Sequence, residues 1–285
     1  MTLINVICYY CGSSRSSHFD SENGFNIVKC DSCGLLYVNP RPSDDDIANG
    51  AETGLHKGEQ TLDLTGTFND EQVQRFNNII NKIYGKNVPA ENSSWLDIGC
   101  GHGEFMTALK VKFENKLILK GCEPNSAKVE SALSKGLDVE AFYPEEHSES
   151  YDYVSLLNVY SHLTNPLNSL NNWKKLVKPG GELLLETGDT TDLTKETIAK
   201  PYYLPDHLSF ATKNIVIDIL KRVGFEILKI HYFRHQGIPE LNIVNVPYDI
   251  KETITGKKNI KELKKYTKKY SHRDMWVRAR RIDNG

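Results

Sequence analysis

The sequence contains no stretch of about eighteen uncharged apolar residues, which a membrane-spanning helix would require. Residues Met1 to Pro40 also lack the basic and then apolar layout of a signal peptide. We therefore expect a cytoplasmic protein with no membrane partner. With 39% hydrophobic and 25% charged residues, the chain is too apolar for wholesale disorder and should fold in water.

A strong net charge of one sign is missing as well. The formal net charge is −2, which supplies no overall attraction to nucleic acid, so we expect nucleic acid not to be a partner. The charge is nevertheless uneven, because residues 251–285 hold twelve Lys or Arg against four Asp or Glu. Such a run is more often a solvated helix face than a phosphate-binding surface, and both interpretations stay open.

The 285 residues suffice for one catalytic domain and a small accessory module. We predict a zinc ribbon over residues 1–40, a helical linker or cap over 41–93, and a catalytic domain over 94–285 that includes the basic segment. Within the linker, Asp44 to Asp46 should begin an N-capped helix. Apolar residues then recur every three or four positions from Phe68 to Tyr84, which predicts a helix with one docking face.

Four of the six cysteines lie within the first 33 residues, in two CxxCG motifs formed by Cys8, Cys11, Cys30 and Cys33. In a cytosolic chain such crowding favours metal over disulfides, and the spacing is typical of a tetrathiolate zinc site. Four thiolates complete a tetrahedral shell, so the predicted zinc is structural and not catalytic. Four unrelated buried thiols are the less favoured alternative.

From Ser94 onward, short apolar runs alternate with helical segments. Strands are expected at residues 94–98, 117–122, 152–157 and 182–186, and helices at 104–113, 126–135, 166–178 and 212–223. This βαβ rhythm predicts an α/β fold with a mainly parallel sheet and helices on both faces. Two further strands, at 225–231 and 275–280, should close one edge of the sheet.

The segment WLDIGCGHGEF, residues 95–105, leads from an apolar strand into glycines 99, 101 and 103. Glycines let the backbone approach a ligand closely at the carboxyl end of a strand. A dinucleotide fingerprint would place a glycine at position 104, where this chain has Glu104, and Asp97 lies inside the strand end. Carboxylates here favour a cationic ligand, such as the ammonium and sulfonium groups of S-adenosylmethionine, over a pyrophosphate.

A second acidic residue supports this interpretation. The strand expected at 117–122 ends at Glu123, about one βαβ step after the glycines, where a carboxylate can accept hydrogen bonds from both ribose hydroxyls. Asp97 and Glu123 should therefore flank one ligand. A tight turn without a ligand is the alternative for the glycines alone, and Glu123 makes it the less favoured one.

On these motifs the chain resembles the class I methyltransferases, and more narrowly their small-molecule branch, which includes the ubiquinone-type and sugar methyltransferases. The resemblance extends from about Trp95 to Leu228, through LDIGCGHG, GCEPN, YDYVSLLNVYSHLTNP, LVKPGGELLLE and DHLSFATKNIVIDILKRVGFE. It implies a Rossmann-like, mainly parallel seven-stranded sheet. It also implies a donor pocket lined by Asp97, Gly99, Cys100, Gly101, Glu123, Pro124, Phe142 and Asn158. The acidic residue that the family commonly has after its third strand is missing from Glu140 to Tyr143, so the adenine contacts are the least defined.

Methyl transfer is an in-line displacement, so the protein mainly aligns the reactants and excludes water, although an oxygen acceptor benefits from a base. The resemblance places His162 beside the transferred methyl and His207 on a segment that often covers the acceptor pocket. Either imidazole could accept a hydroxyl proton, while a structural role for His162 is an equal alternative. We expect Tyr160, Glu186 and Tyr203 to shape the pocket.

The favoured function is O-methylation of a small polar acceptor, a sugar or nucleotide-linked sugar, with S-adenosylmethionine as donor. The segment GLLYVNPRPSDDD resembles the one that joins such ribbons to methyltransferase domains in bacterial sugar methyltransferases. The chain is too short for the large C-terminal domain of three-domain sugar C-methyltransferases, so their chemistry is not carried over. An RNA base methyltransferase and a non-catalytic binding module are the alternatives, and a homodimer is left open.

Overall fold

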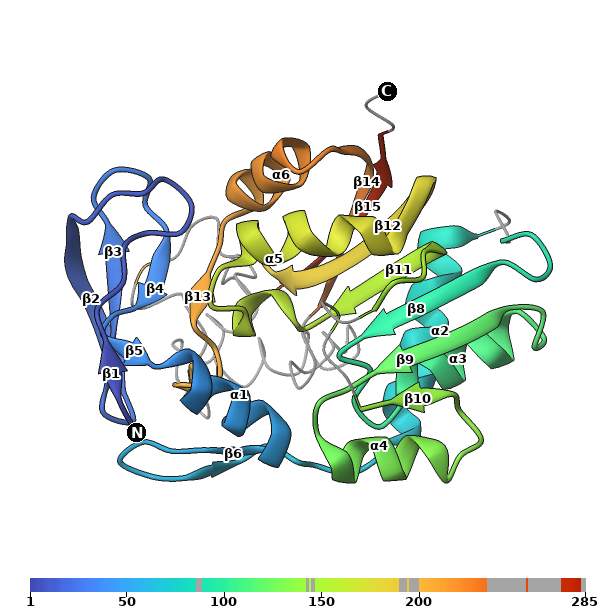
Figure 1. Ribbon diagram of the computed structural model, residues 1–285, viewed down its shortest axis with the longest axis horizontal. Coiled ribbons are helices and arrows are strands. Elements are labelled where there is room, and N and C mark those ends of the chain that lie inside the picture. Colours follow the sequence, from blue (N-terminus) through green and yellow to red (C-terminus); the bar gives the residue numbers. More distant parts are fainter. Residues whose placement is uncertain are drawn as a thin grey trace.

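The computed structural model describes residues 1–85, 89–141, 147–189, 200–234 and 273–282, together with Pro144, Thr194 and Thr255. Its larger part is a seven-stranded sheet of order β10-β9-β8-β11-β12-β15-β14 (Figure 1). The strands are β8 (Ser94–Ile98), β9 (Ile118–Cys122), β10 (Val139–Glu140), β11 (Tyr151–Leu157), β12 (Val177–Gly188), β14 (Phe225–Arg234) and β15 (Arg273–Arg281). Strands β8 to β12 pair in parallel, and β15 runs antiparallel to both of its neighbours. The predicted α/β fold is therefore confirmed.

Helices cover both faces of this sheet, because side chains along each strand point alternately to opposite faces. On β8, Trp95 packs with α2 (Asp70–Tyr84) and α3 (Glu104–Lys112). Leu96 instead joins the apolar cluster under α5 (Pro166–Trp173) and α6 (Lys213–Arg222). Helix α4 (Ser126–Leu133) packs near β10 at the sheet edge. The docking face expected between Phe68 and Tyr84 is thus the buried side of α2.

One predicted boundary is wrong. The helix expected over residues 166–178 ends earlier, with α5 stopping at Trp173 and a single 3-10 turn, η3, covering Lys174–Leu176. Val177 is already the first residue of β12 and pairs with Tyr151. This β-branched residue is 1% exposed and fits a buried strand, which accounts for the earlier end of the helix.

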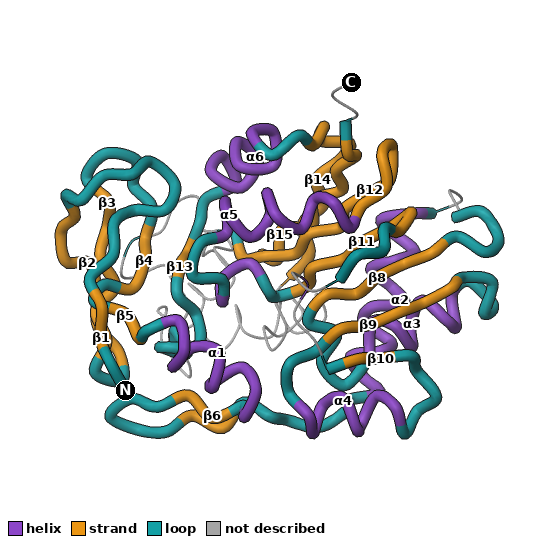
Figure 2. Tube along the Cα trace, in the orientation of Figure 1, coloured by secondary structure: helices purple, strands orange, loops and turns teal. Residues whose placement is uncertain are grey.

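The N-terminal ribbon forms one sheet together with a short strand from the catalytic half. Strands β2 (Ser16–Glu22), β3 (Phe25–Cys30) and β4 (Leu36–Val38) are antiparallel, and β13 (Ser209–Phe210) adds to β4 (Figure 2). Short β1 (Leu3–Ile4) pairs with β5 (Arg41–Pro42). Since the ribbon also shares an apolar cluster with the main sheet, it packs firmly against the catalytic half. The proposed boundaries at residues 40 and 93 stay predictions.

The linker supplies α1 (Asp44–Thr53), β6 (Leu55–His56) and β7 (Leu62–Asp63). Helix α1 begins as expected, because the Ser43 side chain accepts a hydrogen bond from Asp46 N and three acidic residues occupy the first turn. Among the described residues, no helix is both long and apolar enough to cross a membrane.

Candidate functional site

The glycine turn after β8 has a backbone shape that only glycine adopts easily. Gly99, Gly101 and Gly103 have φ of +68°, +56° and +90°. A Cβ atom on Gly99 would lie 2.6 Å from Val159 Cγ2, and one on Gly103 would collide with Leu137 Cδ1. The turn leads straight into α3, so the first N–H groups of that helix face the crevice at the end of β8.

Asp97 is a buried carboxylate inside the end of β8. It is 3% exposed, and its Oδ1 accepts a hydrogen bond of 2.5 Å from Ser155 Oγ, which itself accepts one from Trp95 Nε1. Burial raises the pKa of Asp97 to about 7, and the nearby Glu123 carboxylate adds to the rise although Ser155 opposes it. A carboxylate in this situation would be stabilised by a cationic ligand.

Glu123 follows β9 and is fixed against the same turn. Its Oε2 accepts from Gly101 N at 3.1 Å, and its Oε1 accepts from Asn125 N at 3.1 Å. Because β8 and β9 are neighbours in parallel register, with Ile98 opposite Cys122, both acids lie at the same end of the sheet. Each carboxylate oxygen keeps a second lone pair, which leaves Glu123 able to accept from a ligand as well.

The other predicted donor residues lie around this crevice, with one outside the described part of the chain. Cys100 is 6% exposed, and its backbone N donates to Cys122 O at 3.1 Å. Pro124 is half-buried beside Glu123. Asn158 is exposed at the carboxyl end of β11, the strand next to β8, with φ of +55°. Phe142 lies outside the described residues.

The linker reaches over the glycine turn through contacts that the sequence did not indicate. His102 Nε2 lies 2.9 Å from Thr65 O, and Asn69 N donates to Glu104 Oε1 at 3.0 Å. His102 is 8% exposed. In the sequence, the place of His102 between two glycines of GCGHG was the one indication of this contact, because a side chain in the turn lies close to any segment that covers the turn.

On the acceptor side, two imidazoles share one carboxylate. The 3-10 turn η2 (Tyr160–His162) follows β11 and places His162 Nδ1 2.9 Å from Asp206 Oδ1. His56 Nε2, from β6 of the linker, lies 3.3 Å from the same oxygen. The rings of His162 and His207 are 4.7 Å apart between centroids. The structure thus brings both predicted histidines together and adds His56 and Asp206.

The electrostatics of this cluster orient His162. Burial alone would lower the pKa of His162, but the attraction and hydrogen bond of Asp206 outweigh it, so the pKa is raised. Burial opposes ionisation of Asp206 too, yet His162 and the other imidazoles hold its pKa well below the usual range. An ionised Asp206 fixes a proton on Nδ1 of His162, and Nε2 is then the nitrogen that can accept a proton.

The three residues expected to shape the acceptor pocket differ in burial and in their contacts. Tyr160 is fully buried, and its hydroxyl lies 3.4 Å from the hydroxyl of Tyr9 in the ribbon, so it belongs to the ribbon junction. Glu186 is buried in β12 and Tyr203 is 44% exposed with φ of +60°. Sequence reasoning missed Asp206, although it directly precedes His207, and it missed His56 because nothing in the polar linker marks it.

The four N-terminal cysteines converge. Their sulfur atoms all lie within 4.8 Å of one another, with Cys8 Sγ to Cys33 Sγ and Cys11 Sγ to Cys30 Sγ both 3.5 Å. Gly12 and Gly34 close the two knuckles by donating to the carbonyls of the first cysteine in each. Burial raises the pKa of the Cys8 thiol to about 11. Four thiols this close could hold one soft metal ion in tetrahedral coordination.

A sequence model described as "Methyltransferase domain" matches residues 70–230, which is more than half of the chain. The chain belongs to this methyltransferase family. The matched range contains the glycine turn, both acids, His162 and Asp206–His207. The predicted enzyme class, an S-adenosylmethionine-dependent methyltransferase, is therefore confirmed at the level of the family.

Among curated proteins, the chain is similar to the ubiquinone biosynthesis O-methyltransferase of Aliivibrio fischeri (strain ATCC 700601 / ES114), with 30% identity over 114 residues. That match covers 38% of this chain and 46% of the relative, so the chain spans about half the length of the curated relatives it matches.

Two solved structures show the same fold. The cyclopropane synthase MmaA2 from Mycobacterium tuberculosis has a TM-score of 0.52 at 15% identity, covering 72% of this chain and 83% of that one. The YcgJ protein from Bacillus subtilis has a TM-score of 0.52 at 13% identity, covering 74% of this chain and 100% of that one. At such identities the likeness concerns the fold alone.

Proposed function

We propose that this methyltransferase transfers a methyl group from S-adenosylmethionine to an oxygen atom of a small polar acceptor, a sugar or nucleotide-linked sugar. The observation that carries the proposal is the pair of buried carboxylates, Asp97 and Glu123, on either side of a glycine turn at the ends of adjacent parallel strands. The O-methyltransferase name of the relatives favours oxygen as the methylated atom.

The donor supplies a methyl group that its sulfonium charge already activates. Asp97 would face its cationic part, and the N–H groups at the start of α3 would bind its carboxylate. Glu123 would accept from the ribose hydroxyls, with Gly99 and Gly101 allowing the close approach. Cys100 and Pro124 would form apolar walls, and Asn158 would border the ligand from the neighbouring strand β11.

His162 or His207 would act as general base on the acceptor side. As the acceptor oxygen forms its bond to the methyl carbon and the carbon–sulfur bond breaks, the hydroxyl proton passes to the imidazole. Asp206 would hold His162 by its Nδ1 and stabilise the imidazolium that results. His56, which contacts the same Asp206 oxygen as His162, would help to fix the carboxylate.

Zinc on Cys8, Cys11, Cys30 and Cys33 would be structural in this proposal, because the four thiolates leave no coordination position open. The ribbon would then serve as a support. Its strand β4 pairs with β13, and Ser209 of β13 lies two residues after His207. Zinc would thereby fix the segment that carries Asp206 and His207.

Incubation with methyl-labelled donor and a panel of nucleotide sugars, glycans and RNA tests the assignment. We expect label in the sugar-containing fractions. The donor-site variant Asp97→Asn serves as the control and should label all of them much less at limiting donor. Label in RNA alone would replace the proposal by its nucleic-acid alternative, and label in no fraction despite donor uptake would remove the sugar assignment.

A further inference from the structure

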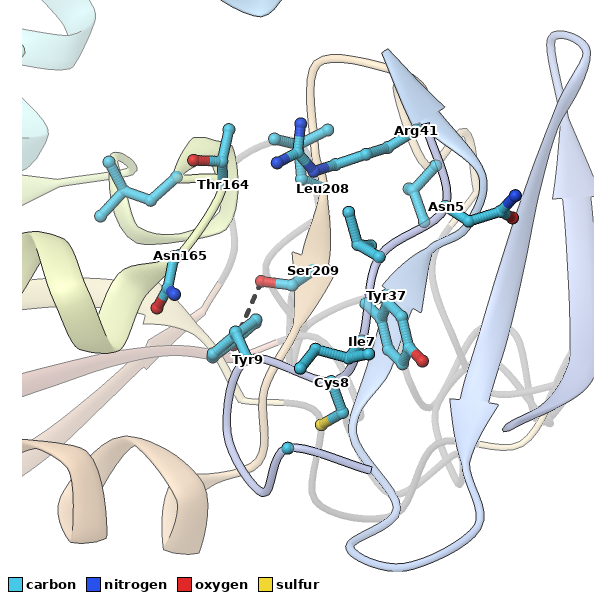
Figure 3. A pocket seen from close by; sticks show the side chains of 14 residues that line it. Asn5, Ile7, Cys8, Tyr9, Tyr37, Arg41, Thr164, Asn165, Leu208 and Ser209 are labelled. Atoms are coloured by element: carbon cyan, nitrogen blue, oxygen red, sulfur yellow. Dashed lines mark hydrogen bonds between the residues drawn. The ribbon is translucent and has the colours of Figure 1, made fainter. Parts of the chain in front are cut away.

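A cavity of about 480 Å³ lies between the ribbon and the catalytic half (Figure 3). Its walls come from residues 5–9, 37–38 and Arg41 on the ribbon side, and from 163–165 and 208–209 on the catalytic side. The last two segments continue directly from His162 and His207. The residues that directly follow both candidate bases along the chain therefore line the cavity.

The lining of this cavity is polar and includes one guanidinium. Among its lining residues, all of which are described, Arg41 is the only Lys, Arg, Asp or Glu, while Cys8 is one of the four cysteines proposed to hold zinc as thiolates. The other polar groups include the amides of Asn5 and Asn165 and the hydroxyls of Thr164, Ser209 and Tyr9. Figure 3 shows the Arg41 side chain extending from its strand toward Leu208 and Thr164. A cavity of this kind suits a ligand that carries negative charge.

The contacts of Arg41 leave several of its N–H groups over. The residue is 8% exposed; its Nη1 donates to Pro42 O at 2.8 Å and its Nη2 pairs with Asp44 Oδ1 at 2.8 Å. Its Nε is buried and has no partner among the described residues. The Asp44 side chain is 72% exposed, so water screens that ion pair. A guanidinium has five N–H groups, and these two contacts use only part of them, so Arg41 can still donate charge-assisted hydrogen bonds to an oxyanion in the cavity that it lines.

We propose that this cavity binds the anionic, non-reacting part of the acceptor, a phosphate or carboxylate group, with Arg41 as its cationic contact. The identification of the ligand as the acceptor rests on the proposed function; the anion site itself rests on Arg41 and the cavity. The acceptor would extend from this anion to the hydroxyl beside His162 and His207. Binding energy from the remote anion would then hold the reacting oxygen in line.

Calorimetric titration of the whole chain with inorganic phosphate and, separately, acetate tests the site. We expect phosphate to bind in the range of about 1–10 mM and R41Q to weaken it about tenfold, the loss of one charge-assisted hydrogen bond. Arg222→Gln is the matched control, because Arg222 contacts the ribbon at Tyr10 O but lies outside the cavity lining. R222Q should bind phosphate as the wild type does. Tighter binding of acetate than of phosphate would identify a carboxylate as the anion.

A second variant tests the site if the substitution of the buried Arg41 prevents folding. Thr164→Trp would fill the cavity from a partly exposed position on its wall and should also abolish phosphate binding. Circular dichroism shows which variants are folded. Phosphate binding equal to the wild type in folded R41Q or T164W would overturn the site, as would a wild type that binds neither anion.

Titration of the same samples with S-adenosylmethionine separates this inference from the proposed function. Donor affinity should be equal in wild type, R41Q and T164W, because none of these positions touches the glycine turn. Arg41-dependent phosphate binding without donor uptake would leave the anion site intact and reject the methyl-transfer proposal. Donor uptake without Arg41-dependent phosphate binding would reject the anion site and leave the methyl-transfer proposal intact.

Discussion

The donor crevice and the acceptor-side cluster are assembled in different ways. The crevice comes from two short segments, 97–104 and 122–125, which follow neighbouring parallel strands and meet because those strands pair. The acceptor-side cluster comes from His56 in the linker, His162 in η2 and Asp206–His207 on the segment leading to β13. The first region is local and the second is assembled by tertiary packing, so the first depends on strand register and the second on the docking of linker and ribbon.

If the acceptor-side cluster holds the base, replacing the histidines should have the largest effect. We expect His162→Ala or His207→Ala to lower kcat by about 10²–10⁴-fold at saturating donor, the usual contribution of a general base. Donor affinity should not change, because neither residue touches the glycine turn. Turnover of both variants is compared with His18→Ala, which removes an exposed ribbon imidazole. Near-normal turnover of both variants would reduce the cluster to a structural role.

Metal removal tests whether the ribbon stabilises the acceptor side without affecting the donor site. Cys11→Ser should lose the bound zinc and lower Tm by roughly 5–10 °C, about 2–3 kcal/mol for a chain of this size. Because β4 holds β13, turnover should fall while donor affinity stays within a factor of about two. Cys122→Ala, outside the cysteine cluster, should keep one zinc per chain by elemental analysis. Full zinc content in C11S would contradict the tetrathiolate site.

Binding of the donor should depend on pH through Asp97. Burial raises the pKa of Asp97 to about 7, so below that pH the carboxyl must lose a proton before it can attract a cation. Donor affinity should therefore fall about tenfold per pH unit below pH 7 and level off above it. Asp97→Asn should weaken donor binding by about 10–100-fold at pH 8 and remove this pH dependence. An unchanged pH profile in D97N would assign the titration to another group.

The smallest expected effect concerns Asp206. Its carboxylate raises the pKa of His162 against the opposing effect of burial, so the acidic limb of turnover should lie above the ordinary pKa of histidine. Asp206→Asn removes that charge and should move the limb to lower pH, with a reduced plateau. A limb that stays in place would mean that His162 is not the titrating base, and would favour His207.

The same contrast explains what could be predicted from the sequence. Local sequence patterns predict the sheet, its flanking helices, and the positions of Asp97 and Glu123. An apolar run that leads into glycines or an acidic residue indicates a strand, and it also indicates that the ligand binds at the carboxyl end of that strand. The helix at 166–178 was predicted too long because the pairing of Val177 with Tyr151 in the sheet depends on tertiary packing. His56 and the Tyr9–Tyr160 contact depend on segments brought together only by the fold, and no period or motif in the sequence encodes that.

Calorimetric titration of wild-type protein with S-adenosylmethionine at pH 8 tests most directly whether the glycine turn between Asp97 and Glu123 binds a sulfonium nucleoside. We predict one donor molecule bound per chain, with affinity reduced in both D97N and E123Q. A folded protein that takes up neither S-adenosylmethionine nor its demethylated product, or variants that bind the donor as well as the wild type does, would contradict the account.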